Sequence, residues 1–165
     1  DQEEPFVGRT GEVEDDLGST IVCARLVRDL MRMCFLIERE YAPYIKWFGS
    51  AFSQLKCASS LAPILSSAMR GRDWHEREEH LIRAFELVAE MFNDLRLVEP
   101  LSTTPRLFHG RPFRVLGSRR FVEACMNATP LRDFGYRGSL DQMSDSTDVL
   151  SNPEFFKQLG EKLWQ

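Results

Sequence analysis

The sequence lacks paired cysteines, long apolar runs and the short motifs of common nucleotide and metal enzymes. Its four cysteines form no C-x-x-C pair: Cys23, Cys34, Cys57 and Cys125. Neither a structural zinc site nor a disulfide framework is therefore expected. No apolar run approaches the roughly 18 residues that a membrane span needs. The motifs G-x-x-x-x-G-K-[ST], G-x-G-x-x-G, H-E-x-x-H and G-x-S-x-G are also missing, so no familiar catalytic or phosphate-binding loop is present.

The sequence also has no excess of positive charge. The net charge is -4, so no global field attracts nucleic acid or an anionic membrane, and neither is favoured as a partner. Most of the 21 basic residues are arginines, whose forked guanidinium suits planar anions, so local anion sites are compatible with the composition. The chain begins without Met or a signal peptide and its cysteines suit a reducing compartment, which predicts a fragment of a longer, cytoplasmic protein.

An all-α fold is predicted for most of the 165 residues. Residues 1–18 are polar, acidic and without periodicity, so we expect a linker or N-terminal arm there, followed by a single helical domain over 19–165. Capping residues and helical spacing predict helices at about 20–41, 43–57, 59–71, 73–97, 118–127 and 152–163. Ser19 or Thr20 is the expected N-cap of the first of these, and Asp73 that of the fourth. With the weakly alternating stretch 106–117, this gives an irregular helical bundle of about five to seven helices with one extended, arginine-rich connection.

The predicted helix at about 20–41 is apolar on most of its circumference. Its one polar stripe consists of residues at i, i+3, i+4 and i+7: Arg25, Arg28, Asp29 and Arg32. A helix this apolar is largely buried, and burying unpaired charge is costly. Two interpretations stay open. Either the stripe faces water with Asp29 pairing locally, or Arg28 and Arg32 line the wall of an anion-binding cleft.

Three large amphipathic rings surround one lysine where this helix gives way to the next. Tyr41, Tyr44 and Trp47 flank Lys46, and such rings stack on a flat ligand while the lysine meets its phosphate or carboxylate. The same rings are equally typical of a core whose polar tips reach water. Glu38, just before them, is a secondary candidate that acts as a base towards an acceptor hydroxyl or pairs with a nearby arginine.

The segment 106–114 is arginine-rich and has no acid close by. Arg111 follows a flexible glycine, and Arg119 and Arg120 continue the positive charge. Anions bind where arginines converge with free backbone N–H groups, so Arg111 is an anion-binding candidate. A solvated basic loop is the alternative.

The segment 138–148 is acidic. Asp141 and Asp145 are secondary candidates, because carboxylates on one helical turn are able to converge on a cation. Their spacing does not match a pair of carboxylates one residue apart on a strand, which two-metal chemistry requires. Capping roles are therefore favoured and no metal site is predicted.

Six stretches, in order along nearly the whole chain, carry a family resemblance. They are residues 18–32, 35–47, 74–78, 108–113, 138–142 and 145–150, and the most specific is Tyr41-Ala42-Pro43-Tyr44-Ile45-Lys46-Trp47. With these stretches the chain resembles the domain of unknown function family numbered 4037. The resemblance implies a helical domain placed C-terminal to a nucleotidyltransferase-like domain. By analogy with antibiotic nucleotidyltransferases, such helical halves close over the active site and hold the acceptor substrate.

The first functional hypothesis is a helical substrate-binding domain that completes the cleft of a nucleotidyltransferase-like protein and is not catalytic alone. A small anionic or nucleotide-like ligand would be held by basic residues and shaped by rings: Arg28, Arg32, Lys46, Arg111, Tyr41, Tyr44 and Trp47. The fragment itself is expected to hold no cofactor. Mg²⁺ and a nucleoside triphosphate would be bound mainly by the N-terminal partner domain.

The alternative is a non-catalytic protein-interaction or dimerisation module. A binding cleft gathers Arg28, Lys46 and Arg111 in one concavity, whereas a docking surface is flat and exposes Trp47 within an apolar patch. A third reading, an autonomous enzyme, is disfavoured because the sequence shows no recognisable nucleophile–base pair.

Overall fold

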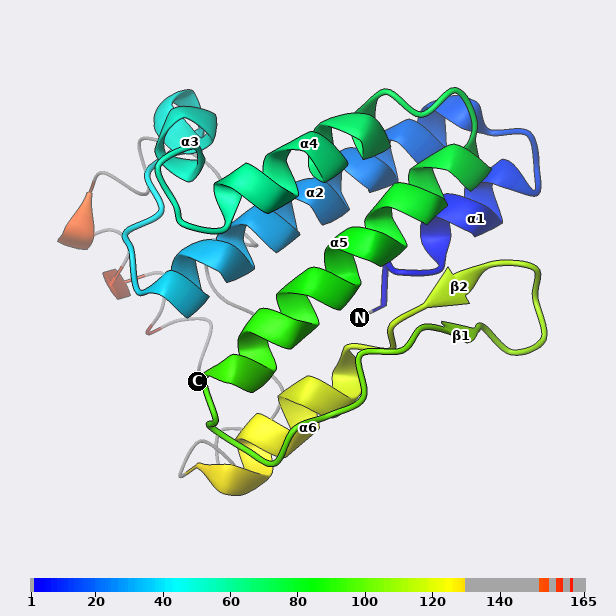
Figure 1. Ribbon diagram of the computed structural model, residues 1–165. Helices are drawn as coiled ribbons and strands as arrows, with labels where there is room; N and C mark the ends of the chain where they lie inside the picture. The colour runs from blue at the N-terminus through cyan, green and yellow to red at the C-terminus, as the bar shows by residue number, and fades with distance from the viewer. Residues whose placement is uncertain (1, 130–151, 155–156, 159–160, 162–165) are drawn as a thin grey trace.

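The computed structural model describes residues 2–129, 152–154, 157–158 and 161. This part of the chain contains six helices and one small hairpin (Figure 1). The helices are α1 (Phe6–Gly11), α2 (Asp16–Glu38), α3 (Ile45–Phe52), α4 (Ala58–Met69), α5 (Trp74–Asp94) and α6 (Arg119–Ala128), and the strands are β1 (Arg106–Leu107) and β2 (Arg114–Val115). The predicted irregular helical bundle with one extended, arginine-rich connection is confirmed.

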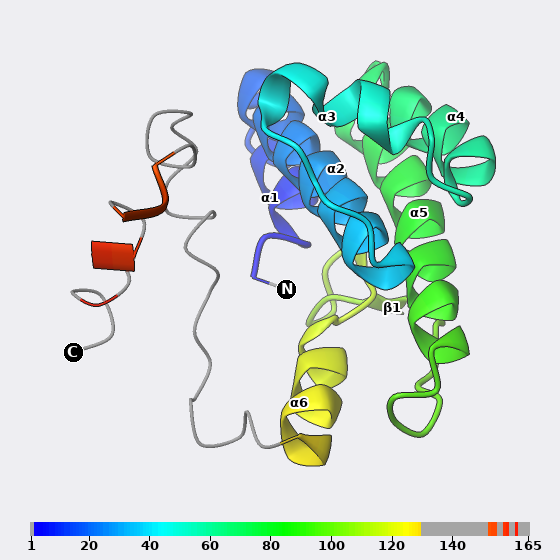
Figure 2. The same cartoon turned by 90° about the vertical axis from the view of Figure 1, so that its left-hand side faces the viewer.

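Three long helices form the centre of the fold. Helix α2 packs against α1, α4 and α5, and α4 packs along α5 (Figures 1 and 2). The apolar positions of α2 recur every three or four residues, and the side chains at these positions are buried against the neighbouring helices. The core therefore runs along the length of α2, with contributions from α4 and α5 that include Leu61, Leu65, Leu81 and Val88.

Two helix starts show how local chemistry sets the boundaries. Asp73 caps α5 as predicted, because its Oδ1 accepts a hydrogen bond of 2.9 Å from the N–H of Glu76. The prediction that Ser19 or Thr20 caps α2 is wrong. Asp15 performs this role by accepting a bond of 2.7 Å from Gly18, while Ser19 is fully buried inside the helix and accepts a hydrogen bond from the Arg77 guanidinium.

Residues 6–11 form helix α1, within the segment 1–18 for which a linker or N-terminal arm was expected. Helix α1 packs against α2 and α5, and its Val7 is almost completely buried. A Cβ atom at Gly8 would lie 2.6 Å from the ring of Phe113, so glycine permits this close approach. The helix is too short to show a recognisable hydrophobic period, so it could not be predicted from the sequence pattern.

The hairpin is fastened to the start of α5 by a single carboxylate. Strands β1 and β2 pair antiparallel, with Arg106 opposite Val115 and Leu107 opposite Arg114. Buried Glu78 of α5 accepts hydrogen bonds of 3.0 Å from both the backbone N–H and Nε of Arg114. The hairpin is thereby held beside the first turns of α5.

None of the helices in the described part of the chain combines the length and the apolarity that a membrane span requires. The predicted helix at about 152–163 falls largely on residues outside the described part.

Candidate functional site

The chain turns sharply between α2 and α3. Arg39 ends α2 in the left-handed conformation, with φ of 58°, and its N–H and that of Glu40 return to carbonyls of the last turn of α2. Residues 40–44 are irregular, and Tyr44 directly precedes α3. This turn places the segment 40–47 at one end of the helical layer (Figure 1).

Helix α3 is held to the core by two phenylalanines. Phe48 and Phe52 are buried one turn apart and pack on Phe35 of α2, with ring centroids 5.4 and 6.4 Å from that of Phe35. Because these two rings fill the contact with α2, the residues at the start of α3 face away from α2. The anchoring of α3 therefore leaves its first turn at the surface.

The segment around the start of α3 exposes most of its large side chains. Tyr41 is 86% exposed, Trp47 is 52% exposed, and Tyr44 and Ile45 are exposed as well. The Nζ atom of Lys46 lies 5.1 Å from the centroid of the Trp47 ring, a cation–π contact. We call Tyr41, Tyr44, Ile45, Lys46 and Trp47 the aromatic surface. The interpretation of these rings as core residues is wrong, since Phe48 and Phe52 take that role.

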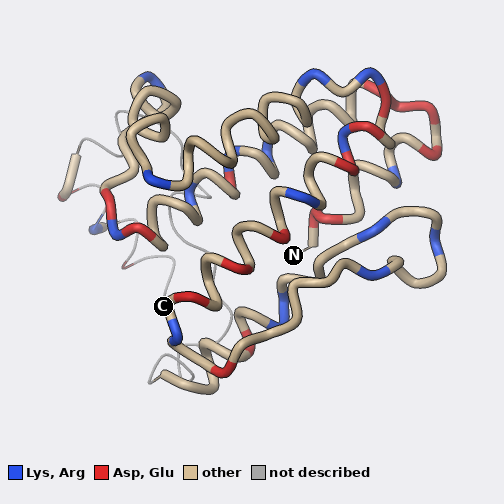
Figure 3. The backbone as a smooth tube through the Cα atoms, in the orientation of Figure 1, with Lys and Arg blue, Asp and Glu red and all other residues tan. Residues whose placement is uncertain are grey.

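The other predicted basic residues lie elsewhere. Arg28 and Arg32 are partly buried one turn apart on α2, and Arg111 lies in the hairpin loop. Nη1 of Arg111 is 3.4 Å from Oε2 of Glu12, which directly follows α1. Figures 1 and 3 show the hairpin and α3 at opposite ends of the layer. The structure therefore does not bring Lys46 and Arg111 into one concavity.

Glu38 joins the end of α2 to the start of α4. Its two carboxylate oxygens accept hydrogen bonds from the backbone N–H groups of Lys56, at 2.8 Å, and Cys57, at 2.9 Å. Partial burial raises the pKa of Glu38, but the bonds from Cys57 and Lys56 outweigh it and hold this pKa below its usual value. The expected ion pair with an arginine is replaced by these backbone contacts, so the carboxylate serves as a cap rather than as a free base.

Replacing Glu38 by alanine is expected to destabilise the fold by about 1–3 kcal/mol, because two N–H groups at the start of α4 lose their acceptor. The folded-state pKa of Glu38 is lowered, so its contribution is present above the unfolded pKa. It is lost as the pH falls from about 5 through the folded pKa. Urea unfolding at pH 7 and pH 3.5 measures both effects. The exposed neighbour Glu40 provides the control, and an equal loss in Glu40→Ala would contradict this role for Glu38.

The thiols near this cap are not activated. Burial raises the pKa of Cys34 to about 11, and the hydrogen bond from Cys57 only partly offsets it. Burial and the neighbouring Glu38 carboxylate also raise the pKa of Cys57. Both thiols are therefore protonated at neutral pH, and neither is a ready nucleophile.

No group of His, Cys, Asp and Glu within the described ranges is arranged to hold a metal ion. The secondary candidates Asp141 and Asp145 lie outside the described residues. The site that emerges is therefore the aromatic surface, with Arg28 and Arg32 as candidates on the helix that supports it.

The comparisons with known proteins bear on the first part of the chain. Residues 1–48 match the family model described as Domain of unknown function (DUF4037). The match confirms the family number that the resemblance suggested, and it includes the whole aromatic surface. No curated protein and no solved structure matches the chain.

Proposed function

We propose that this chain, whose first 48 residues match a family of unknown function, is a helical substrate-binding domain whose aromatic surface forms one wall of a ligand cleft. The opposite wall is a nucleotidyltransferase-like domain of the same cytoplasmic parent protein. The observation that carries the proposal is the exposure of Tyr41, Tyr44 and Trp47 around Lys46, at the start of a helix that Phe48 and Phe52 hold against α2.

An open wall explains why these rings are exposed. Ligand sites bury most of the ligand surface and are concave. Two hollows on the described residues, one beside the start of α6 and one beside α5, include no member of the aromatic surface. Rings of this size contribute substantial binding energy only when a second surface covers them. A partner domain that faces the aromatic surface supplies this cover.

Each member of the wall has a distinct role in the proposal. Tyr41 and Trp47 present flat faces for a planar group, and Lys46 meets a phosphate or carboxylate beside the indole. Arg28 and Arg32 extend the basic character along α2. Mg²⁺ and the nucleoside triphosphate are held by the partner domain. Arg111 is left out, because it belongs to the loop of the hairpin, and the hairpin lies at the other end of the helical layer from α3 (Figure 1).

A second candidate function follows from the same exposure. A surface with Tyr, Trp and Ile exposed together is also typical of a protein-docking or dimerisation site. The two functions differ in what covers the rings, a ligand with its partner domain or a second copy of this chain. Light scattering of the isolated chain separates them, because a dimer that Trp47→Ala dissociates supports the docking function.

The ligand proposal is tested by thermal-shift screening of the parent protein against nucleotides, sugar phosphates and aminoglycosides, with and without Mg²⁺. Binding raises the melting temperature by mass action. We expect a shift that Lys46→Ala and Trp47→Ala each reduce by at least half at fixed ligand concentration. Lys56→Ala, an exposed lysine outside the aromatic surface, is the control. A shift of wild-type size in both variants would refute the proposed wall.

A further inference from the structure

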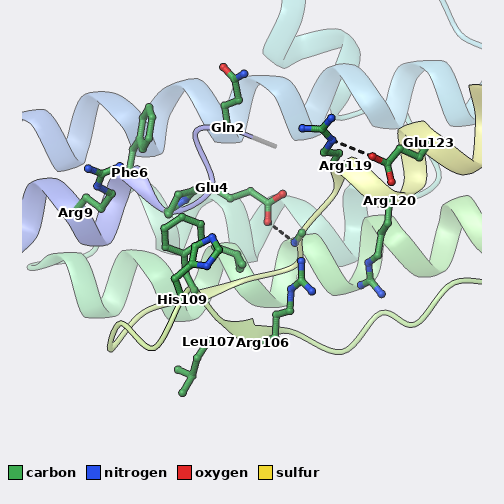
Figure 4. Close-up of a pocket in the computed structure, with 14 residues that line it drawn as sticks. Gln2, Glu4, Phe6, Arg9, Arg106, Leu107, His109, Arg119, Arg120 and Glu123 are labelled. Carbon is green, nitrogen blue, oxygen red and sulfur yellow. Dashed lines mark hydrogen bonds and ion pairs between the residues drawn. The ribbon is translucent and has the colours of Figure 1, made fainter. Parts of the chain in front are cut away.

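A concave region lies apart from the aromatic surface, and none of its lining residues belongs to that surface. It has a volume of 720 Å³ and is bounded by the N-terminal segment, the hairpin and the start of α6 (Figure 4). This volume is typical of small-molecule sites, which span about 300–1,000 Å³. We call it the arginine pocket after its most frequent lining residue. The members that carry the argument are Phe6, Arg9, Arg106, Phe108 and Arg120.

The acids of the arginine pocket are already engaged. Glu4 is buried and accepts hydrogen bonds of 2.8 Å from the N–H groups of Gly117 and Ser118, and a further one from the Ser118 hydroxyl. Glu123 pairs with Arg119 at 2.9 Å. Neither carboxylate bonds Arg9 or Arg106, and these two guanidinium groups have no carboxylate partner among the described residues.

The fold positions two of the arginines. A Cβ atom at Gly117 would lie 2.9 Å from Nη2 of Arg106, so the glycine lets this guanidinium approach the chain just before α6. Gly117 also has a φ of 73°, a conformation that glycine favours. Arg120 donates from Nη2 to the carbonyl of Leu116 at 3.1 Å, and its guanidinium lies 5.1 Å from the ring of Phe121. Both arginines line the same hollow, and the positive end of the α6 dipole lies beside them.

Apolar rings complete the arginine pocket. Phe108 stacks on buried Phe113 at 5.9 Å between centroids. The guanidinium carbon of Arg9 lies 5.8 Å from the centroid of the Phe6 ring, a cation–π contact. The lining thus combines unpaired cations with ring surface. An inorganic anion uses only the cations, whereas a phosphorylated organic molecule uses both.

We propose that the arginine pocket is a binding site for a small phosphorylated organic molecule, distinct from the aromatic surface. Arg106 and Arg120 hold the phosphate from β1 and α6. Arg9 closes the site from α1, and the organic part lies against Phe6 and Phe108. Glu4 holds the loop before α6 in place, so its removal would alter the pocket without removing a ligand contact.

The test is isothermal titration of the protein with phenyl phosphate, inorganic phosphate and phenol at low ionic strength. We expect phenyl phosphate to bind more tightly than inorganic phosphate and phenol not to bind. Arg106→Ala and Arg120→Ala should each weaken phenyl phosphate about tenfold, the usual effect of losing one charge-assisted contact. Arg70→Ala removes an exposed arginine at the end of α4 and should change nothing.

Circular dichroism and the melting temperature verify that each variant is folded. Lys46→Ala separates this proposal from the proposed function, since the aromatic surface lies elsewhere. Wild-type affinity in both Arg106→Ala and Arg120→Ala, or absence of binding at millimolar phenyl phosphate, would overturn the assignment. Weakening by Lys46→Ala alone would overturn it too, because the probe would then occupy the aromatic surface.

Discussion

Alanine in place of Phe35 is expected to lower the free energy of unfolding by about 3–5 kcal/mol. Phe35 is 2% exposed, and its ring contacts the two phenylalanines that hold α3. The substitution removes buried apolar area and leaves a cavity between α2 and α3. Since α3 has no other aromatic contact to the core in the described residues, we expect its loosening to displace Trp47 and Lys46 from the aromatic surface.

Urea unfolding followed by circular dichroism measures the loss, and hydrogen exchange of the α3 amides reports the local loosening. Leu36→Ala is the matched control, because Leu36 is the next residue of the same helix and is 72% exposed. A change below about 1 kcal/mol is expected for the control. Equal losses in the two variants would show that the packing of α3 does not depend on this ring contact.

Alanine in place of Phe113 is expected to have a similar effect on stability, about 3–5 kcal/mol, with a different functional consequence. Phe113 is 1% exposed. Its ring lies against Gly8 of α1 and meets Trp74 edge-on at 6.3 Å between centroids. It therefore joins α1, α5 and the hairpin, and its loss should disorder the wall of the arginine pocket.

The control for this variant is Leu107→Ala, on the paired strand of the same hairpin, where the side chain is exposed. Denaturant midpoints give the stability, and titration with phenyl phosphate gives the state of the pocket. We expect the Phe113→Ala variant to lose binding of phenyl phosphate at a denaturant concentration at which circular dichroism still shows its helices. Retention of wild-type affinity would show that the hairpin keeps its position without this ring.

The long helices were predictable because their sequence signals are redundant. In α5 the Asp73 cap and many periodic apolar residues agree. In α2 the periodicity alone sufficed, although the cap was assigned to the wrong residue. Helix α1 could not be predicted in this way. Its six residues span less than two turns, and its stability comes from Val7 and Gly8 packing on distant parts of the chain.

The candidate site was predicted by residue type but not by arrangement. The spacing of Phe48 and Phe52 indicates a buried face, yet only the path after Arg39 shows that Tyr41 and Trp47 lie off it. The expectation that Lys46 and Arg111 line one cleft failed. Glu78 bonds the hairpin that carries Arg111 to the first turns of α5, away from α3. The arginine pocket escaped prediction for a related reason, since Arg9 belongs to the segment that was expected to be a linker.

The bonds between Glu4 and the start of α6 also bear on the order in which the chain assembles. They join residues 113 and 114 positions apart, whereas α4 and α5 are neighbours in sequence. Closing so long a loop costs more entropy than pairing adjacent helices. During synthesis the Glu4 carboxylate leaves the ribosome long before its donors exist. The central helices are therefore able to collapse first. Docking of the N-terminal segment onto the start of α6 is then the last step in the folding of the described part of the chain.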